Sequence, residues 1–240
     1  MTQDSLAKVK GVCDIVFLID ISGSMRPCLD GLVDNIQNFI SWFQEAPDAN
    51  TPSVIADWRI KVCGYRDYES DGSLWWVEHP FVANDPDAAK ANLDSLEAKG
   101  GGDEPECLLD GLWKVCSLGV SEKGAAPEPE KWRHRHEAAR IVIVFTDATY
   151  KPTCLIPEAL GATWEDIKNK ITEMKLRVCM FVPDGQECYY EMSVIDKCEI
   201  EEIPGVLGDP QMMIDYTADK AKFSKTMEAL AKTVSKSSMT

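Results

Sequence analysis

Two hydrophobic periods alternate along the chain. Residues 12–19 form an apolar run that only Asp14 interrupts, and such a run is typical of a strand buried on both faces of a parallel sheet. Apolar side chains then recur at helical spacing between Leu29 and Phe43. The alternation continues to the C-terminus. It predicts further strands at 58–65, 74–82, 140–147, 176–182 and 200–203, and further helices at 86–98, 107–118, 164–174, 187–197 and 217–234.

Buried strands that alternate with amphipathic helices predict one α/β domain, with a mostly parallel central sheet covered by helices on both faces. We place this domain at residues 12–235, between an N-terminal extension (1–11) and a flexible tail (236–240). Pro80 cannot donate a backbone hydrogen bond, so the strand that contains it is expected at an edge of the sheet. We expect the segment 119–138, which is rich in charged residues, to be a solvated loop.

An excess of acidic residues narrows the range of partners. The 240 residues include 40 Asp and Glu against 25 Lys and Arg, which gives a formal net charge of −15. A surface this acidic disfavours nucleic acid and anionic membranes as partners. It suits a cation instead.

The cysteines and the first residues of the chain lead us to expect a cytoplasmic protein. Nine cysteines are an odd number, and no two of them have the C-x-x-C spacing of zinc or redox motifs, so we expect reduced thiols. Residues 1–11 contain no apolar core of a secretory signal. The longest apolar runs are also too short to span a bilayer.

The first predicted strand ends in the sequence Asp-Ile-Ser-Gly-Ser. This sequence places a carboxylate and two hydroxyls at alternate positions, Asp20, Ser22 and Ser24, and a tight loop can direct all three toward one point. Hard oxygen ligands of this kind suit Mg²⁺, Mn²⁺ or Ca²⁺. A turn capped by these polar side chains, without a metal, is the alternative interpretation.

Two further segments place acids at the ends of predicted elements. The sequence GGGDEPE (100–106) opens the helix that begins at Cys107, and the run IVIVFTDA brings Asp147 to the end of a buried strand. Together with the Asp-x-Ser-x-Ser loop, these segments resemble the three motifs of the metal-ion-dependent adhesion site in von Willebrand factor A (VWA) domains. The second segment is most similar to the GGGDxPE version in hemicentin-like VWA domains. The resemblance covers roughly residues 12–235.

The resemblance implies a Rossmann-like VWA fold and a bound divalent cation, Mg²⁺ or else Mn²⁺ or Ca²⁺. It assigns the metal ligands to Asp20, Ser22, Ser24, Glu106 and Asp147, with Asp103 as the alternative to Glu106. It also implies that the cation keeps one position open for a carboxylate of a partner protein. Members of this family inside cells act as scaffolds or regulators in complexes. We therefore expect an intracellular interaction module that uses neither nucleic acid nor membrane as its partner.

An enzyme is the alternative class of function. A metal-dependent phosphohydrolase would use Asp20 as its nucleophile. Haloacid-dehalogenase-like enzymes place a second Asp two residues later, where this chain has Ser22. The sequence also lacks the G-x-S-x-G motif of serine hydrolases and a P-loop. We therefore expect a binding module without catalytic activity.

Two charged segments outside the motifs have simpler interpretations. Arg66 and Asp67 follow a predicted strand, and we expect them to form an ion pair with each other. His134 and His136 lie between arginines and could form a metal or phosphate patch. A solvated loop that leads into the next strand is the interpretation we prefer for them.

Overall fold

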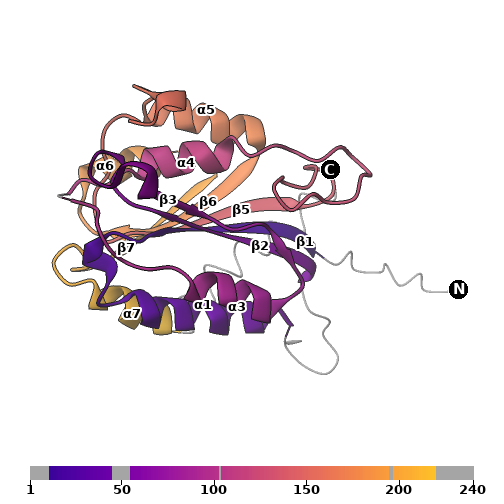
Figure 1. Cartoon of the computed structure of the whole chain (residues 1–240), viewed down its shortest axis with the longest axis horizontal. Coiled ribbons are helices and arrows are strands. Elements are labelled where there is room, and N and C mark those ends of the chain that lie inside the picture. Colours follow the sequence, from indigo (N-terminus) through magenta and orange to yellow (C-terminus); the bar gives the residue numbers. More distant parts are fainter. Residues whose placement is uncertain (1–10, 45–54, 103, 195–196, 220–240) are drawn as a thin grey trace, which may run out of the picture.

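The computed structural model describes residues 11–44, 55–102, 104–194 and 197–219. It is an α/β structure in which helices lie on both faces of a mostly parallel sheet, as predicted (Figure 1). The strands are β1 (Gly11–Asp20), β2 (Ile55–Tyr65), β3 (Trp76–Glu78), β4 (Val82–Ala83), β5 (Ala139–Phe145), β6 (Leu176–Pro183) and β7 (Cys198–Ile203). The helices are α1 (Leu29–Gln44), α2 (Tyr68–Asp71), α3 (Pro86–Asp94), α4 (Leu108–Cys116), α5 (Trp164–Met174), α6 (Glu187–Met192) and α7 (Gln211–Ala218), with 3-10 turns η1 (Gly23–Met25), η2 (Gly72–Leu74) and η3 (Pro157–Ala159). No described helix is long and apolar enough to cross a membrane.

The chain order of the strands reverses beside β1. Across the sheet the order is β3-β2-β1-β5-β6-β7. β1 pairs in parallel with β2 on one side and with β5 on the other, and β6 and β7 continue the parallel arrangement. The carboxyl ends of β1 and β5 therefore lie next to each other at the position where open α/β sheets bind their ligands.

The edge strand expected at 74–82 is split in two. β3 and β4 each pair antiparallel with β2, and Pro80 lies between them. A proline has no N–H to continue a ladder, so pairing stops there and resumes two residues later. Leu74 belongs to the turn η2 instead of to the strand.

Both faces of the sheet are buried, which explains the apolar run in β1 that only Asp14 interrupts. Ile15, Phe17 and Ile19 pack with residues of α1, α3 and α7 on one face. Val16 and Leu18 pack with residues of α4 and α5 on the other. Figure 1 shows these two helical layers on opposite sides of the strands. A strand in the middle of such a sandwich has no solvent-facing positions, so it carries no polar alternation.

Helix ends account for most differences from the predicted elements. α5 spans the predicted residues, whereas α3 and α6 end four and five residues early. After α3 the chain turns back to the sheet, where the backbone N–H of Lys99 donates to the carbonyl of Ile21 at 3.0 Å. The helix α7 was not predicted. The helix predicted at 217–234 lies almost entirely outside the described residues.

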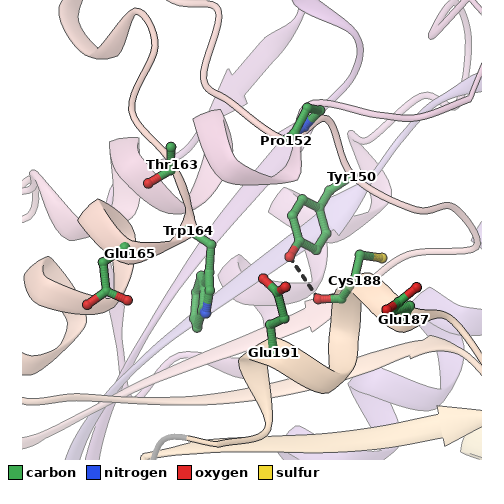
Figure 2. A pocket seen from close by; sticks show the side chains of 8 residues that line it. All are labelled: Tyr150, Pro152, Thr163, Trp164, Glu165, Glu187, Cys188 and Glu191. Carbon is green, nitrogen blue, oxygen red and sulfur yellow. Dashed lines mark hydrogen bonds between the residues drawn. The ribbon is translucent and has the colours of Figure 1, made fainter.

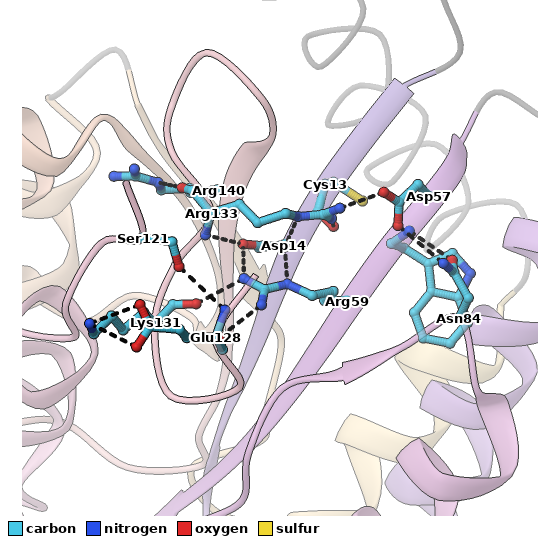
Figure 3. Close-up of polar contacts among 11 residues, drawn as sticks. Cys13, Asp14, Asp57, Arg59, Asn84, Ser121, Glu128, Lys131, Arg133 and Arg140 are labelled. Atoms are coloured by element: carbon cyan, nitrogen blue, oxygen red, sulfur yellow. Dashed lines mark hydrogen bonds and ion pairs between the residues drawn. The ribbon is translucent and has the colours of Figure 1, made fainter. Parts of the chain in front are cut away.

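A buried charge anchors the segment 119–138 to the sheet (Figure 3). Asp14 in β1 is fully buried and accepts hydrogen bonds from Arg59 at 2.9 and 2.7 Å. It also accepts from Nε of Arg133 at 2.8 Å and from the backbone N–H of the same residue at 2.7 Å. Trp132, the residue before Arg133, is fully buried. The expectation of a solvated loop is therefore wrong for this part of the segment, because a buried carboxylate needs partners of opposite charge.

Candidate metal centre

Asp20 is the last residue of β1, and its carboxylate is fully buried. Its Oδ1 accepts a hydrogen bond from the backbone N–H of Ser22 at 2.9 Å. Its Oδ2 accepts from the hydroxyl of Thr146, the residue directly after β5, at 2.8 Å. One carboxylate thus fixes both the loop after β1 and the end of the neighbouring strand.

Ser22 and Ser24 form a short chain of hydroxyls that leads from the interior to the surface. Ser22 is buried, Ser24 is exposed, and their Oγ atoms are 3.0 Å apart. The hydroxyl of Ser24 donates to Oδ1 of Asp147 at 3.1 Å. The loop after β1 and the acid after β5, which are more than 120 residues apart, therefore meet as the sequence pattern predicted.

Gly101 allows the second motif to approach this loop. Its φ is +90°, in the left-handed region that disfavours residues with a Cβ. A Cβ at this position would lie 2.5 Å from Cβ of Ser22 and 2.6 Å from Oε1 of Glu106. The glycine thus leaves room for the Glu106 carboxylate to lie beside the serine loop.

Glu106 is the most unusual group of the site. Its side chain is buried, and its Oε2 has no hydrogen-bond partner among the described residues. Its backbone is fixed by the N–H of Glu106, which donates to the carbonyl of Thr149 at 3.0 Å. A buried carboxylate oxygen without a partner is costly unless another ligand satisfies it.

Four of the predicted ligands line one small cavity. Ser22, Ser24, Glu106 and Asp147 surround a volume of about 120 Å³, and Asp20 lies behind Ser22. The alternative ligand, Asp103, lies outside the described residues.

The sequence analysis missed three residues of this site. Thr146 binds Asp20, and Leu207 lines the cavity. Glu104 also lines it, and its Oε1 accepts hydrogen bonds from the backbone N–H and the hydroxyl of Thr149 at 2.9 and 2.8 Å. Thr146 had a visible signal, since it is the polar residue at the end of a buried apolar strand.

Burial and crowding disfavour the charged form of the carboxyl groups in the site. Burial, and then the charge of Asp147, raises the pKa of Asp20 to about 7. Burial, followed by the charges of Asp20 and Asp67, raises the pKa of Glu106 to about 9. Burial also raises the pKa of Asp147 above its usual range. No Lys or Arg of the described chain forms an ion pair with Asp20, Glu106 or Asp147.

The composition of the donor set restricts how a metal could be held. Within the described ranges, no three His, Cys, Asp or Glu side chains come together as a metal-binding group. A cation in the cavity would therefore rely on the two serine hydroxyls in addition to carboxylates. Oxygen donors of this mixed kind fit Mg²⁺ or Ca²⁺ better than a thiophilic metal.

Arg66 and Asp67 do not pair with each other, so that expectation is wrong. Arg66 donates to the backbone carbonyls of Ile21 and Glu97, at 3.2 and 2.7 Å. Asp67 instead forms an ion pair with Lys151 at 3.2 Å. Arg66 therefore binds backbone carbonyls and not the carboxylate next to it in the chain. It joins the loop after β1 to the segment that leads into the second motif.

A larger cavity of about 410 Å³ opens beside the site, between α5 and α6 (Figure 2). Tyr150 and Trp164 line it, and the hydroxyl of Tyr150 donates to the carbonyl of Cys188 at 2.8 Å. Burial raises the pKa of the Cys188 thiol, which disfavours the reactive thiolate. All nine cysteines are free thiols, and Cys188 is partly exposed whereas the other eight are buried. None of the predicted metal ligands lines this cavity.

Comparisons with known proteins show a likeness in fold only. No family model matches the chain, and no curated protein matches it. Among solved structures, the pilus adhesin SpaC from Lactobacillus rhamnosus GG is similar, with 15% identity and a TM-score of 0.51 over 90% of this chain and 30% of that one. Proximal thread matrix protein 1 from the mussel byssus is similar as well, with 14% identity and a TM-score of 0.54 over 94% of this chain and 47% of that one. The chain thus spans less than half of either structure.

Proposed function

We propose that the chain is a VWA domain with a Rossmann-like sandwich, and that its metal-ion-dependent adhesion site binds one divalent cation. The cation is Mg²⁺, or Mn²⁺ or Ca²⁺ in its place, and it captures a carboxylate of a partner protein. The reversal of strand order between β1 and β5 supports this proposal, because the three motifs lie where such sheets bind ligands.

The single observation that carries the proposal is the unpaired oxygen of Glu106. Oε2 is buried without a partner, and the same side chain lines a cavity with two serine hydroxyls and Asp147. A divalent cation in that cavity would satisfy the oxygen and offset the repulsion among the acids. Asp103, which lies outside the described residues, stays the alternative to Glu106 as the ligand from the second motif.

Each residue then has a distinct task. Ser22 and Ser24 supply neutral hydroxyl ligands, and Asp20 holds the loop that carries them. Asp147 orients the Ser24 hydroxyl. A divalent cation held by two neutral hydroxyls and the Glu106 carboxylate would keep a net positive charge, so it favours an additional anionic ligand. The bound cation supplies this electrostatic attraction, and the chain supplies its position.

Two features favour binding over the phosphohydrolase alternative. Both oxygens of Asp20 already accept hydrogen bonds, and the side chain is fully buried, so it is poorly placed as a nucleophile. The cavity is small, at about 120 Å³, and it has room for an ion and a carboxylate. We therefore propose a non-catalytic scaffold or regulator, and the nine free thiols favour a cytoplasmic location for it.

Calorimetric titration with Mg²⁺ and Mn²⁺ tests the metal. The wild type should bind one ion, and the double variant Ser22→Ala/Ser24→Ala should bind none. Ser73→Ala/Ser193→Ala is the matched control, since both serines are exposed and neither lines the cavity. Equal binding by all three proteins would remove the basis of the assignment.

A second measurement tests the carboxylate. Water proton relaxation by protein-bound Mn²⁺ should decrease when a short peptide rich in Glu is added, because its carboxylate displaces a metal-bound water. The corresponding Gln peptide should have no effect. Equal effects of the two peptides would contradict capture of a carboxylate while leaving the metal site intact.

A further inference from the structure

A basic groove lies at the opposite end of the sheet from the candidate metal centre. It is formed where β5 and β6 begin and just before β7, in a cavity of about 350 Å³. Five of the chain's 25 Lys and Arg residues line it, together with one histidine. These residues are Arg135, His136, Arg140, Lys175, Arg177 and Lys197.

Arg140 forms a fixed part of this groove. Its side chain is buried, Nε donates to the carbonyl of Arg133 at 2.9 Å, and Nη1 donates to the carbonyl of Met174 at 3.0 Å (Figure 3 shows the first contact). No hydrogen bond among the described residues uses Nη2. The guanidinium is therefore held in place with donor capacity left over, which suits recognition of an anion.

The other cations of the groove have no polar partner among the described residues. Within the described ranges, the side chains of Arg135, Lys175, Arg177 and Lys197 form no hydrogen bond and no ion pair. Glu137, which directly follows His136 in the chain, accepts a hydrogen bond from the backbone N–H of Gly124 at 2.6 Å. In a chain with a net charge of −15, five Lys and Arg residues around one groove are a marked local concentration of positive charge.

Like charges oppose one another in this groove, and the backbone is strained at one position. Burial, together with the charges of Lys175 and Arg177, lowers the pKa of Lys197. Lys175 ends α5 with a φ of +54°, a left-handed conformation in which glycine is the usual residue. A glycine would be less strained at this position, whereas the lysine adds a positive charge to the groove.

We propose that this groove binds a compact ligand that carries two or more phosphate groups. Phosphate oxygens match the fork of an arginine and the point charge of a lysine. The volume of about 350 Å³ lies in the range of small-molecule sites. A long polyanion would also meet the acidic surface outside the groove, whereas a compact ligand meets only the basic residues, because charges are screened beyond about 8 Å at physiological salt.

Calorimetric titration of the full chain with tripolyphosphate and with inositol hexakisphosphate tests the proposal, in 150 mM NaCl with EDTA. The double variant Lys175→Gly/Lys197→Gln should bind at least tenfold more weakly than the wild type. Glycine suits the left-handed position, so this variant should keep its fold. The control Lys90→Gln/Lys123→Gln makes the same change in net charge at exposed positions outside the groove and should bind within twofold of the wild type.

A further experiment distinguishes a lipid headgroup from a free ligand as the source of the phosphate groups. Co-sedimentation with phosphatidylcholine vesicles that contain phosphatidylinositol bisphosphate supports a lipid headgroup, and binding of the soluble probes alone supports a free ligand. The proposal is overturned if neither soluble probe nor vesicle binds, or if the groove variant binds as well as the control. Tighter binding of a single-stranded RNA than of both soluble probes, through the same lysines, would overturn the preference for a compact ligand.

Discussion

The hydroxyl of Thr146 donates a 2.8 Å hydrogen bond to Oδ2 of Asp20 and thereby joins the ends of β1 and β5. The two strands are neighbours in the sheet, but the two residues are 126 positions apart in the chain. A variant without this contact shows how much one buried hydrogen bond at the candidate metal centre contributes to the stability of the fold.

We expect Thr146→Val to lower the free energy of unfolding by about 1–3 kcal/mol, because it leaves a buried carboxylate oxygen without its partner. Urea denaturation of the metal-free protein measures this. Thr146→Ser retains the hydroxyl and should lose much less. If the valine variant is as stable as the wild type, the contact does not hold the end of β1.

Gly101→Ala should abolish metal binding, since the new Cβ would meet Ser22 and the carboxylate of Glu106. The control is Gly124→Ala, which has a similar left-handed φ of +81° and no atom within 4 Å of the new Cβ. Both variants carry the same kind of backbone strain, so a comparison of their Mg²⁺ affinities isolates the clash. Equal affinities would mean that the second motif does not contribute to the site.

The metal-free protein should become less stable as the pH rises from 5 to 9. The pKa of Asp20 and that of Glu106 are raised on folding, to about 7 and about 9, so the folded state holds protons that the unfolded chain releases above pH ~4. The stability these groups contribute is thus complete below pH ~4 and is lost as the pH rises through the folded values. Chemical denaturation across this range measures the slope.

Two comparisons test whether the carboxyl groups of the site cause this decline of stability with pH. Glu106→Gln removes one of the two titrating groups and should flatten the decline, whereas Glu173→Gln, at an exposed position on α5, should leave it unchanged. Saturating Mg²⁺ should stabilise the wild type more at pH 8 than at pH 6. A metal effect independent of pH would contradict the link between these carboxylates and the cation.

Thiol labelling should distinguish Cys188 from the other eight cysteines. Those eight are buried, and burial raises the pKa of Cys13 and of Cys28 to about 12, so the thiolate is scarce. A small maleimide should therefore modify at most one thiol in the native protein and nine after denaturation without reductant. Five or fewer after denaturation would indicate disulfides in the isolated protein.

The sequence was most informative where the spacing of apolar residues follows the period of a single helix or strand. The bounds of α5 follow from its amphipathic spacing, and the buried run 12–19 identified β1 because both faces of that strand are covered. The site residues Ser22, Ser24, Glu106 and Asp147 were predicted to lie together, since parallel strands bring their carboxyl ends to one edge. They do line one cavity.

Features that depend on distant partners were not visible in the sequence. Trp132 lies in a segment rich in charged residues and is yet fully buried, and Arg133 beside it pairs with Asp14 of β1, 119 positions away in the chain. Arg66 donates hydrogen bonds to backbone carbonyls and does not pair with its neighbour Asp67. The basic groove combines residues from three strand beginnings, and only the order of the strands in the sheet brings them together.

Strand β5 separates the two proposed binding regions by a fixed length. It begins beside Arg140 in the groove and ends just before Asp147, and its seven residues span roughly 23 Å at ~3.3 Å each. A central, fully hydrogen-bonded strand does not shorten or slip when a ligand arrives at one end. Occupancy at one pole should therefore leave the affinity at the other unchanged, so that the chain acts as a rigid spacer between a phosphate-bearing ligand and a carboxylate-bearing protein.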